Sequence, residues 1–184
     1  MEVTVIRSRR KTVAVQVKPD GTVLVRAPRL LPQREIRRFV EDHQGWIEKQ
    51  LRKQAAAREL GKDLEPLSMR ELKELSESAR RDLTQRSAYW AERVGVTYGR
   101  ISIRHQKSKW GSCSSKGNLN FNCLLMLAPE SVRDYVVVHE LCHRKHMNHS
   151  PSFWQAVEQV LPDWRSAKAW LKQNGDALML RNPV

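Results

Sequence analysis

Four of the six histidines in this chain lie within a stretch of eleven residues, at His139, His143, His146 and His149. His139 and His143 are four residues apart, so on a helix their imidazoles share one face and can both bind a single Zn²⁺. Glu140 follows His139 directly, and beside such a metal its carboxylate can take a proton from the metal-bound water. The spacing therefore predicts a hydrolytic zinc centre.

A third ligand is needed to hold zinc while leaving one position open for water. His149 lies ten residues after His139, which is the ligand spacing of the metzincin pattern. That pattern has a glycine where the chain leaves the helix, and this chain has His146 at that position. His149 and His146 therefore both stand as candidates for the third ligand.

The three cysteines point to neither a disulfide scaffold nor a cysteine zinc site. Cys113 and Cys123 are ten residues apart and have no paired C-x-x-C spacing, and Cys142 is expected to pack as a small hydrophobe beside the histidines. No apolar run reaches the length of a membrane span, and the N-terminus lacks the apolar core of a signal peptide. We expect a soluble, cytoplasmic protein without membrane contact.

The elements that must position the histidines follow from the hydrophobic pattern. Valines alternating with polar residues predict three antiparallel strands over residues 2–27, arranged as a meander with a turn at Pro19-Asp20-Gly21. Apolar residues at three- and four-residue steps predict helices over residues 33–59 and about 68–94. The first half of the chain is therefore expected to be β followed by α.

The second half is expected to repeat this order. Alternation predicts a strand from Ile101 to His105 and another from Leu119 to Asn122. Helices are expected to begin at Pro129, before the histidines, at Pro151, and after Pro162, with the last one stopped by Asn174-Gly175.

We expect an α+β fold, with an N-terminal antiparallel β-meander and long helices joined to a catalytic domain that carries the His-Glu-x-x-His helix. The 184 residues, 40% of them hydrophobic, suffice for a buried core. We predict a basic meander-plus-helix domain over residues 1–62 and a metallohydrolase domain over residues 63–184. The alternative is one compact unit.

The charge is strongly basic and uneven. The chain has 33 Lys and Arg against 20 Asp and Glu, and residues 1–62 alone contain 15 and 7. Such a surplus attracts polyanions, so nucleic acid is a candidate partner of the N-terminal lobe. A solvated basic face that only aids solubility is the alternative interpretation.

The stretch Trp110-Gly111-Ser112-Cys113 admits two interpretations. It could form a strand edge that receives the backbone of an extended substrate, with Trp110 lining a subsite. It could equally be a structural turn anchored by a buried tryptophan.

The chain resembles the YgjP-like metallopeptidase family, whose relatives are the SprT-like and WLM zincins. The resemblance covers nearly the whole chain and is most specific around the histidines. It is carried by Arg9-Arg10-Lys11, Lys18-Pro19-Asp20-Gly21, Val25-Arg26-Ala27-Pro28, Trp46-Ile47, Lys109-Trp110-Gly111-Ser112-Cys113-Ser114, Asn120-Phe121-Asn122, Val137-Val138-His139-Glu140-Leu141-Cys142-His143, Asn148-His149-Ser150-Pro151 and Phe153-Trp154. It implies a zincin-like catalytic domain with zinc held by His139, His143 and His149.

The expected function is that of a zinc-dependent metallopeptidase that hydrolyses peptide bonds by metal-activated water, with Glu140 as general base. The basic lobe would recruit proteins bound to nucleic acid. Two alternatives stay open: a zinc-dependent ribonuclease, and a nucleic-acid-binding module with structural zinc. Candidate donors to the oxyanion are Tyr135, His146, Asn148 and Lys109.

Overall fold

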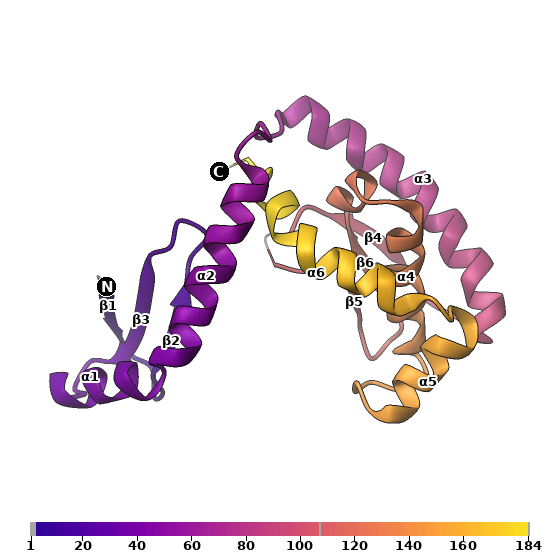
Figure 1. The fold of residues 1–184 in the computed structure, drawn as a ribbon. Coiled ribbons are helices and arrows are strands. Elements are labelled where there is room, and N and C mark those ends of the chain that lie inside the picture. The colour runs from indigo at the N-terminus through magenta and orange to yellow at the C-terminus, as the bar shows by residue number, and fades with distance from the viewer. Residues whose placement is uncertain (1–2, 107, 184) are drawn as a thin grey trace. The chain divides into compact units, whose positions relative to one another are not determined.

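The computed structural model describes residues 3–106 and 108–183, and the chain divides into two compact units, Met1–Asp63 and Leu64–Val184. Figure 1 shows the elements of each unit. Glu2, the first residue of the expected β segment, lies outside the described residues. Among the described helices, none has both the length and the apolar character that crossing a membrane requires.

The N-terminal unit combines a small sheet with two helices. Its elements are β1 (Val3–Ser8), β2 (Ala14–Val17), β3 (Val23–Pro28), α1 (Gln33–Asp42) and α2 (Gln44–Gly61). Val23 packs with Ile47 of α2, and Val25 packs with Ile36 of α1. The apolar faces of both helices therefore cover the same central strand.

The expected antiparallel meander is wrong. The strand order is β1-β3-β2, and β1 pairs with β3 in parallel, whereas β2 pairs with β3 antiparallel across the predicted Pro19-Asp20-Gly21 turn. β3 is the most buried of the three strands and lies at the centre. A period of two shows that a strand has one buried face, but it does not show which strand becomes its neighbour.

The single helix expected over residues 33–59 is also wrong, because the chain forms two helices that meet at His43. The backbone of His43 takes φ −106° and ψ 8°, and its Nδ1–H donates to the carbonyl of Phe39 at 2.8 Å. Since Ile36 and Ile47 both pack on β3, the apolar spacing continues across the break and does not reveal it.

The C-terminal unit contains the histidines. Its elements are α3 (Met69–Val94), β4 (Ile101–Arg104), β5 (Gly111–Cys113), β6 (Leu119–Asn122), the 3₁₀ helix η1 (Cys123–Leu127), α4 (Glu130–Cys142), α5 (Pro151–Val160) and α6 (Trp164–Leu180). The predicted helix over about 68–94 is confirmed as α3. Ser68 and Glu71 cap its start, and Gly95 ends it in the left-handed conformation.

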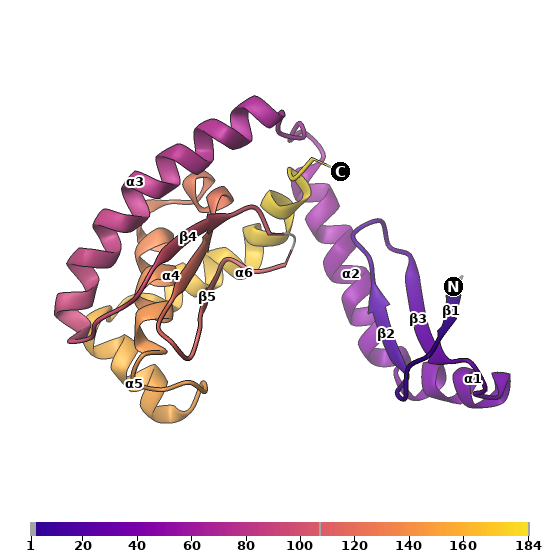
Figure 2. The ribbon, with the colours of Figure 1, turned by 180° about the vertical axis from the view of Figure 1, so that it is seen from behind.

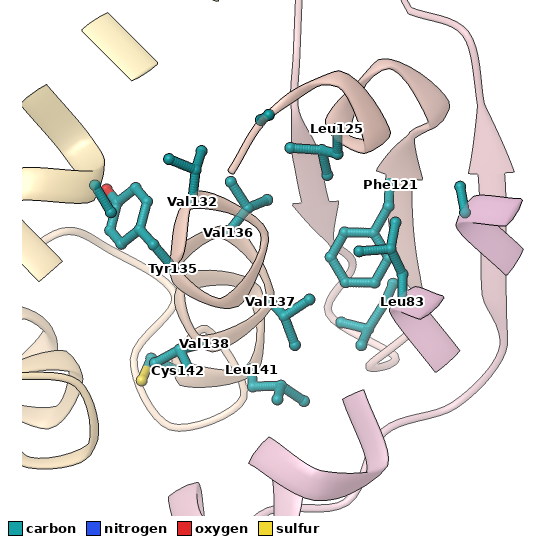
Figure 3. Close-up of a cluster of buried hydrophobic side chains, with 14 of the residues drawn as sticks. Leu83, Phe121, Leu125, Val132, Tyr135, Val136, Val137, Val138, Leu141 and Cys142 are labelled. Atoms are coloured by element: carbon teal, nitrogen blue, oxygen red, sulfur yellow. The ribbon is translucent and has the colours of Figure 1, made fainter. Parts of the chain in front are cut away.

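Helix α4 is the centre of this unit. It packs against α3, α5, α6 and β5, and Figures 1 and 2 show it between α6 and the sheet. In Figure 3, Val137 faces Phe121 of β6 and Leu83 of α3, while Tyr135 lies on the other side of the helix. Burial on nearly all sides holds α4 rigidly. His139 lies in its last turn, and His143 is its C-cap.

Near the site, Gly111–Cys113 is a strand, β5, at one edge of the sheet order β4-β6-β5, as the first of the two interpretations of this stretch has it. One expectation differs from the structure. Helix α6 does not stop at Asn174-Gly175 but continues to Leu180. Gly175 is a weak helix former, yet an added Cβ there would lie 3.1 Å from Nε1 of Trp110, so the glycine gives the indole room to pack.

Candidate metal centre

The end of α4 and the start of α5 bring the histidines together. His139 and Glu140 lie in the last turn of α4, and His143 is its C-cap. The following turn is tied down by Arg144, whose Nε donates to the carbonyl of Thr97 at 3.0 Å. His149 then precedes Ser150, which caps the start of α5.

His139, His143 and His149 each offer a ring nitrogen, and these three atoms lie within 4.8 Å of one another. Nε2 of His139 and Nε2 of His149 are 3.0 Å apart. The buried ring of Phe153 lies beneath all three imidazoles, with centroid distances of 4.9, 4.6 and 4.9 Å to His139, His143 and His149. Contact with the ring of Phe153 therefore helps to hold the three imidazoles at these positions.

The hydrogen bonding of His143 defines which of its nitrogens is free. Its Nδ1 lies 3.0 Å from the backbone carbonyl of His146. Because a carbonyl only accepts, Nδ1 carries the proton and Nε2 keeps its lone pair for a metal. The backbone carbonyl of His146 therefore orients the ring of His143, and the imidazole of His146 is outside the three-histidine cluster.

The surroundings of His139 and His149 favour the neutral imidazole, the form that binds metals. Burial, followed by the positive charges that His143, His149 and Lys168 would contribute, lowers the pKa of His139 to about 3. Burial, His143 and Lys168 also lower the pKa of His149. Nδ1 of His139 is buried without a hydrogen-bond partner among the described residues.

Glu140 follows His139 in the last turn of α4, and its side chain is only 5% exposed. Burial raises the pKa of its carboxyl group to about 8, against the lowering effects of the Lys109 charge and of a hydrogen bond from the backbone N–H of Cys113. A Cβ at Gly111 would lie 2.7 Å from Oε1 and 2.8 Å from Cγ of Glu140. Strand β5 therefore holds the carboxylate from one side.

A cavity of about 180 Å³ opens beside His139 and Glu140. Its lining residues are Lys109, Trp110, Gly111, Tyr135, Val136, His139, Glu140 and Leu171. Burial and the charge of Glu140 raise the pKa of Tyr135 to about 12, so its hydroxyl stays a proton donor at neutral pH. Of the four candidate oxyanion donors, Tyr135 and Lys109 line this cavity, and His146 and Asn148 do not.

The loop before β5 is anchored by a buried side chain. Nδ2 of Asn122 donates to the carbonyls of Gln106 at 2.8 Å and Lys109 at 3.0 Å, and its Oδ1 accepts from the N–H of Leu124 at 3.1 Å. The side chain is completely buried. Asn122 thus fixes the position of the backbone that leads into Trp110 and Gly111.

The residues present fit a zinc ion. Nitrogen donors of three imidazoles form a ligand set that zinc accepts, and three ligands leave a fourth position open. Two nitrogens bound tetrahedrally at about 2.0–2.1 Å would be roughly 3.3 Å apart, close to the observed 3.0 Å between His139 and His149.

Several residues of this site carry no local signal of their role. In the sequence, Phe153 is one apolar position of a helix, and Gly111 is part of a stretch that predicts a strand edge or a turn, so neither indicates a contact with the histidines or with Glu140. Asn122 read as the end of a strand, although a polar residue after the apolar Leu119 and Phe121 could have suggested a buried anchor. Lys168 gave no indication of lying near the histidines.

The chain is similar to a known protein family and to two solved structures. The family described as "YgjP-like, metallopeptidase domain" matches residues 11–74 and 66–174. The crystal structure of the metallopeptidase zymogen abylysin of Pyrococcus abyssi is 24% identical, with a TM-score of 0.46 over 55% of this chain and 99% of that one. The zymogen jannalysin of Methanocaldococcus jannaschii is 19% identical, with a TM-score of 0.45 over 50% and 94%. No curated protein sequence matches the chain.

Proposed function

Because the chain belongs to the YgjP-like metallopeptidase family, we propose that it is a zinc-dependent peptidase in which His139, His143 and His149 hold the metal and Glu140 is the general base. The observation that carries the proposal is the convergence of three imidazole nitrogens within 4.8 Å beside a buried carboxylate. Structural zinc sites are commonly closed by four protein ligands, so a set of three favours catalysis.

The chemistry divides between the metal and the side chains around the cavity. Zinc, when bound, would acidify a water molecule and polarise the scissile carbonyl. Glu140 takes a proton from the attacking water and delivers it to the leaving amine nitrogen. Gly111 and the N–H of Cys113 hold the carboxylate of Glu140 in place for both transfers.

The charge that develops on the carbonyl oxygen needs a donor from the chain. Tyr135 is the best-supported donor. It lines the cavity together with His139 and Glu140, and its hydroxyl stays protonated at neutral pH. Lys109, which lines the same cavity, is the second candidate.

Strand β5 offers a place for the substrate backbone. It lies at the edge of its sheet, so the backbone groups on its side away from β6 can pair with an extended peptide, except for the N–H of Cys113, which donates to Glu140. Its antiparallel pairing with β6 and the anchoring of the preceding loop by Asn122 hold that edge still. A peptide added there would pass next to Glu140, which touches Gly111 of the same strand.

We also propose that the basic N-terminal unit binds polyanions, so that the peptidase acts on proteins associated with nucleic acid. The support is the surplus of 15 basic over 7 acidic residues in residues 1–62. Such a surplus produces salt-dependent, sequence-independent attraction to phosphate backbones.

The experiment compares protein and RNA as substrates of the same preparation. Purified protein is stripped with a chelator, reloaded with zinc, and incubated with unfolded casein, a peptide library and labelled RNA. The proposal expects zinc-dependent cleavage of casein or peptides and none of RNA. Zinc-dependent RNA cleavage without peptide cleavage would establish the ribonuclease instead, and zinc retention without either activity would favour a structural site.

A further inference from the structure

Lys168 of α6 is a cation that contacts aromatic rings. Its Nζ lies 3.9 Å from the ring centroid of Trp154 and 5.1 Å from that of Trp164. The ion pairs found within residues 3–106 and 108–183 do not include Lys168. Its ammonium group is therefore held at a defined place with its charge uncompensated.

That place is beside the three histidines. The rings of Trp154 and Trp164 stack with centroids 4.5 Å apart, and the Trp154 centroid lies 5.7 Å from His149 and 5.8 Å from His139. The ammonium group and two of the imidazoles thus share one indole as a neighbour.

A purely structural role explains this lysine poorly. A cation repels the metal dication that the three histidines would hold, whereas a methionine would cover the same indole without that cost. The acidic residue beside His139, Glu140, is buried and contacts the β5 strand. The local field at the exposed side of the centre therefore favours a negatively charged group that arrives from solution.

We propose that Lys168, seated on Trp154, binds a carboxylate of the peptide substrate next to the scissile bond, and that the enzyme consequently prefers acidic peptides. This inference rests on the proposed peptidase function. The carboxylate comes either from an Asp or Glu side chain or from the C-terminus of the peptide, and both present the same group to an ammonium.

The test uses matched peptide pairs and four proteins. One pair series places Glu or Gln at each position around the cleaved bond, and a second series carries a free or an amidated C-terminus. The proteins are wild type, Lys168→Met, Lys168→Arg and Lys172→Met, the last removing an equal charge one helical turn away. All four should have the same melting temperature, because both lysines are exposed.

Wild type should cleave the carboxylate member of at least one pair about tenfold faster in kcat/KM, as expected for a charge-assisted hydrogen bond. Lys168→Met should reduce that preference to about twofold or less. Lys168→Arg and Lys172→Met should keep it. The series that shows the preference identifies the source of the carboxylate as a side chain or a C-terminus.

Zinc affinity supplies a readout that does not depend on turnover. Removing a nearby positive charge should tighten zinc binding about threefold in Lys168→Met, measured by competition with a chelator at low salt. Lys172→Met should change it less. A lysine that only supported the fold would weaken zinc binding when replaced, so the direction of the change separates the two roles.

The outcomes separate this inference from the proposed function. Peptide cleavage with equal rates for both members of every pair would overturn the carboxylate subsite and leave the peptidase intact. If no peptide is cleaved, binding of the same pairs to the zinc-loaded Glu140→Gln variant still tests the subsite. Equal affinity for both members in that assay would overturn it.

Discussion

Gly111 of β5 and Glu140 of α4 are in contact so close that no larger residue fits between them. A Cβ at position 111 would lie 2.7 Å from Oε1, 2.8 Å from Cγ and 3.0 Å from Cδ of Glu140. Gly111 is not among the described glycines with positive φ, so its backbone would accept an alanine. The requirement for glycine is the space that the carboxylate occupies.

Gly111→Ala should displace Glu140 and lower kcat by about 10- to 100-fold, because a misplacement of about 1 Å has effects of that size. Zinc content should be unchanged, since the three atoms nearest to the added methyl group all belong to Glu140 and none to a histidine. The measurements are kcat and metal content. Gly45→Ala is the control, because a Cβ at Gly45 meets no atom within 4 Å. Full activity of Gly111→Ala would show that the position of Glu140 is not critical.

Glu140→Gln keeps the size of the side chain and its place beside the cluster but removes the base. Metal content and melting temperature should stay close to wild type, and turnover should fall by about 10²–10⁴-fold. Metal analysis and a cleavage assay on the same preparation check both parts. A variant that loses its zinc would indicate that Glu140 is a ligand or structural, and one with full activity would contradict the mechanism.

Replacing the histidines one at a time should rank their importance for the metal. His139→Ala and His143→Ala should abolish zinc binding, and His149→Ala should weaken it severely, since two ligands hold zinc poorly. His146→Ala should keep most of it, because His146 contributes its backbone carbonyl to His143. Zinc content after dialysis is the measurement. The reverse result for His149 and His146 would exchange their roles.

Asn122→Ala should destabilise the C-terminal unit, because it removes three hydrogen bonds of a fully buried side chain, to the carbonyls of Gln106 and Lys109 and from the N–H of Leu124, and only Gln106 keeps another donor, Asn182. We expect the free energy of unfolding to fall by about 2–3 kcal/mol. Urea unfolding followed by tryptophan fluorescence measures it, since five of the six tryptophans lie in residues 64–184. Asn120→Ala, which removes one bond to Ser112, should cost less than about 1 kcal/mol.

Binding of nucleic acid by the N-terminal unit should depend steeply on salt. Affinity for single- or double-stranded nucleic acid should fall between about 50 and 200 mM salt, as counterion release requires. Neutralising Arg9, Arg10 and Lys11 together should flatten the slope of affinity against salt concentration. Fluorescence anisotropy over a salt series measures both. No detectable binding at low salt would reduce the charge to a feature of solubility.

The candidate metal ligands and the helix that carries two of them can be predicted from local sequence alone. His139, Glu140 and His143 belong to one helical stretch, and the apolar periodicity before them already predicts that helix. The periodicity and the four-residue spacing of the two histidines both follow from 3.6 residues per turn. Most helices and strands could be recognised in the same way. Their signals depend on residues a few positions apart, and these signals are present in the chain before it folds.

Which residues lie next to the two helical histidines and Glu140 follows from the tertiary structure and not from local sequence. It brought His149 rather than the imidazole of His146 beside the helical pair, and it made Gly111–Cys113 a strand against Glu140. It also paired β1 in parallel with β3, broke the first helix at His43 and brought Lys168 beside the cluster. Each of these outcomes depends on packing between segments distant in the chain, and periodicity contains no information about which distant surfaces become neighbours.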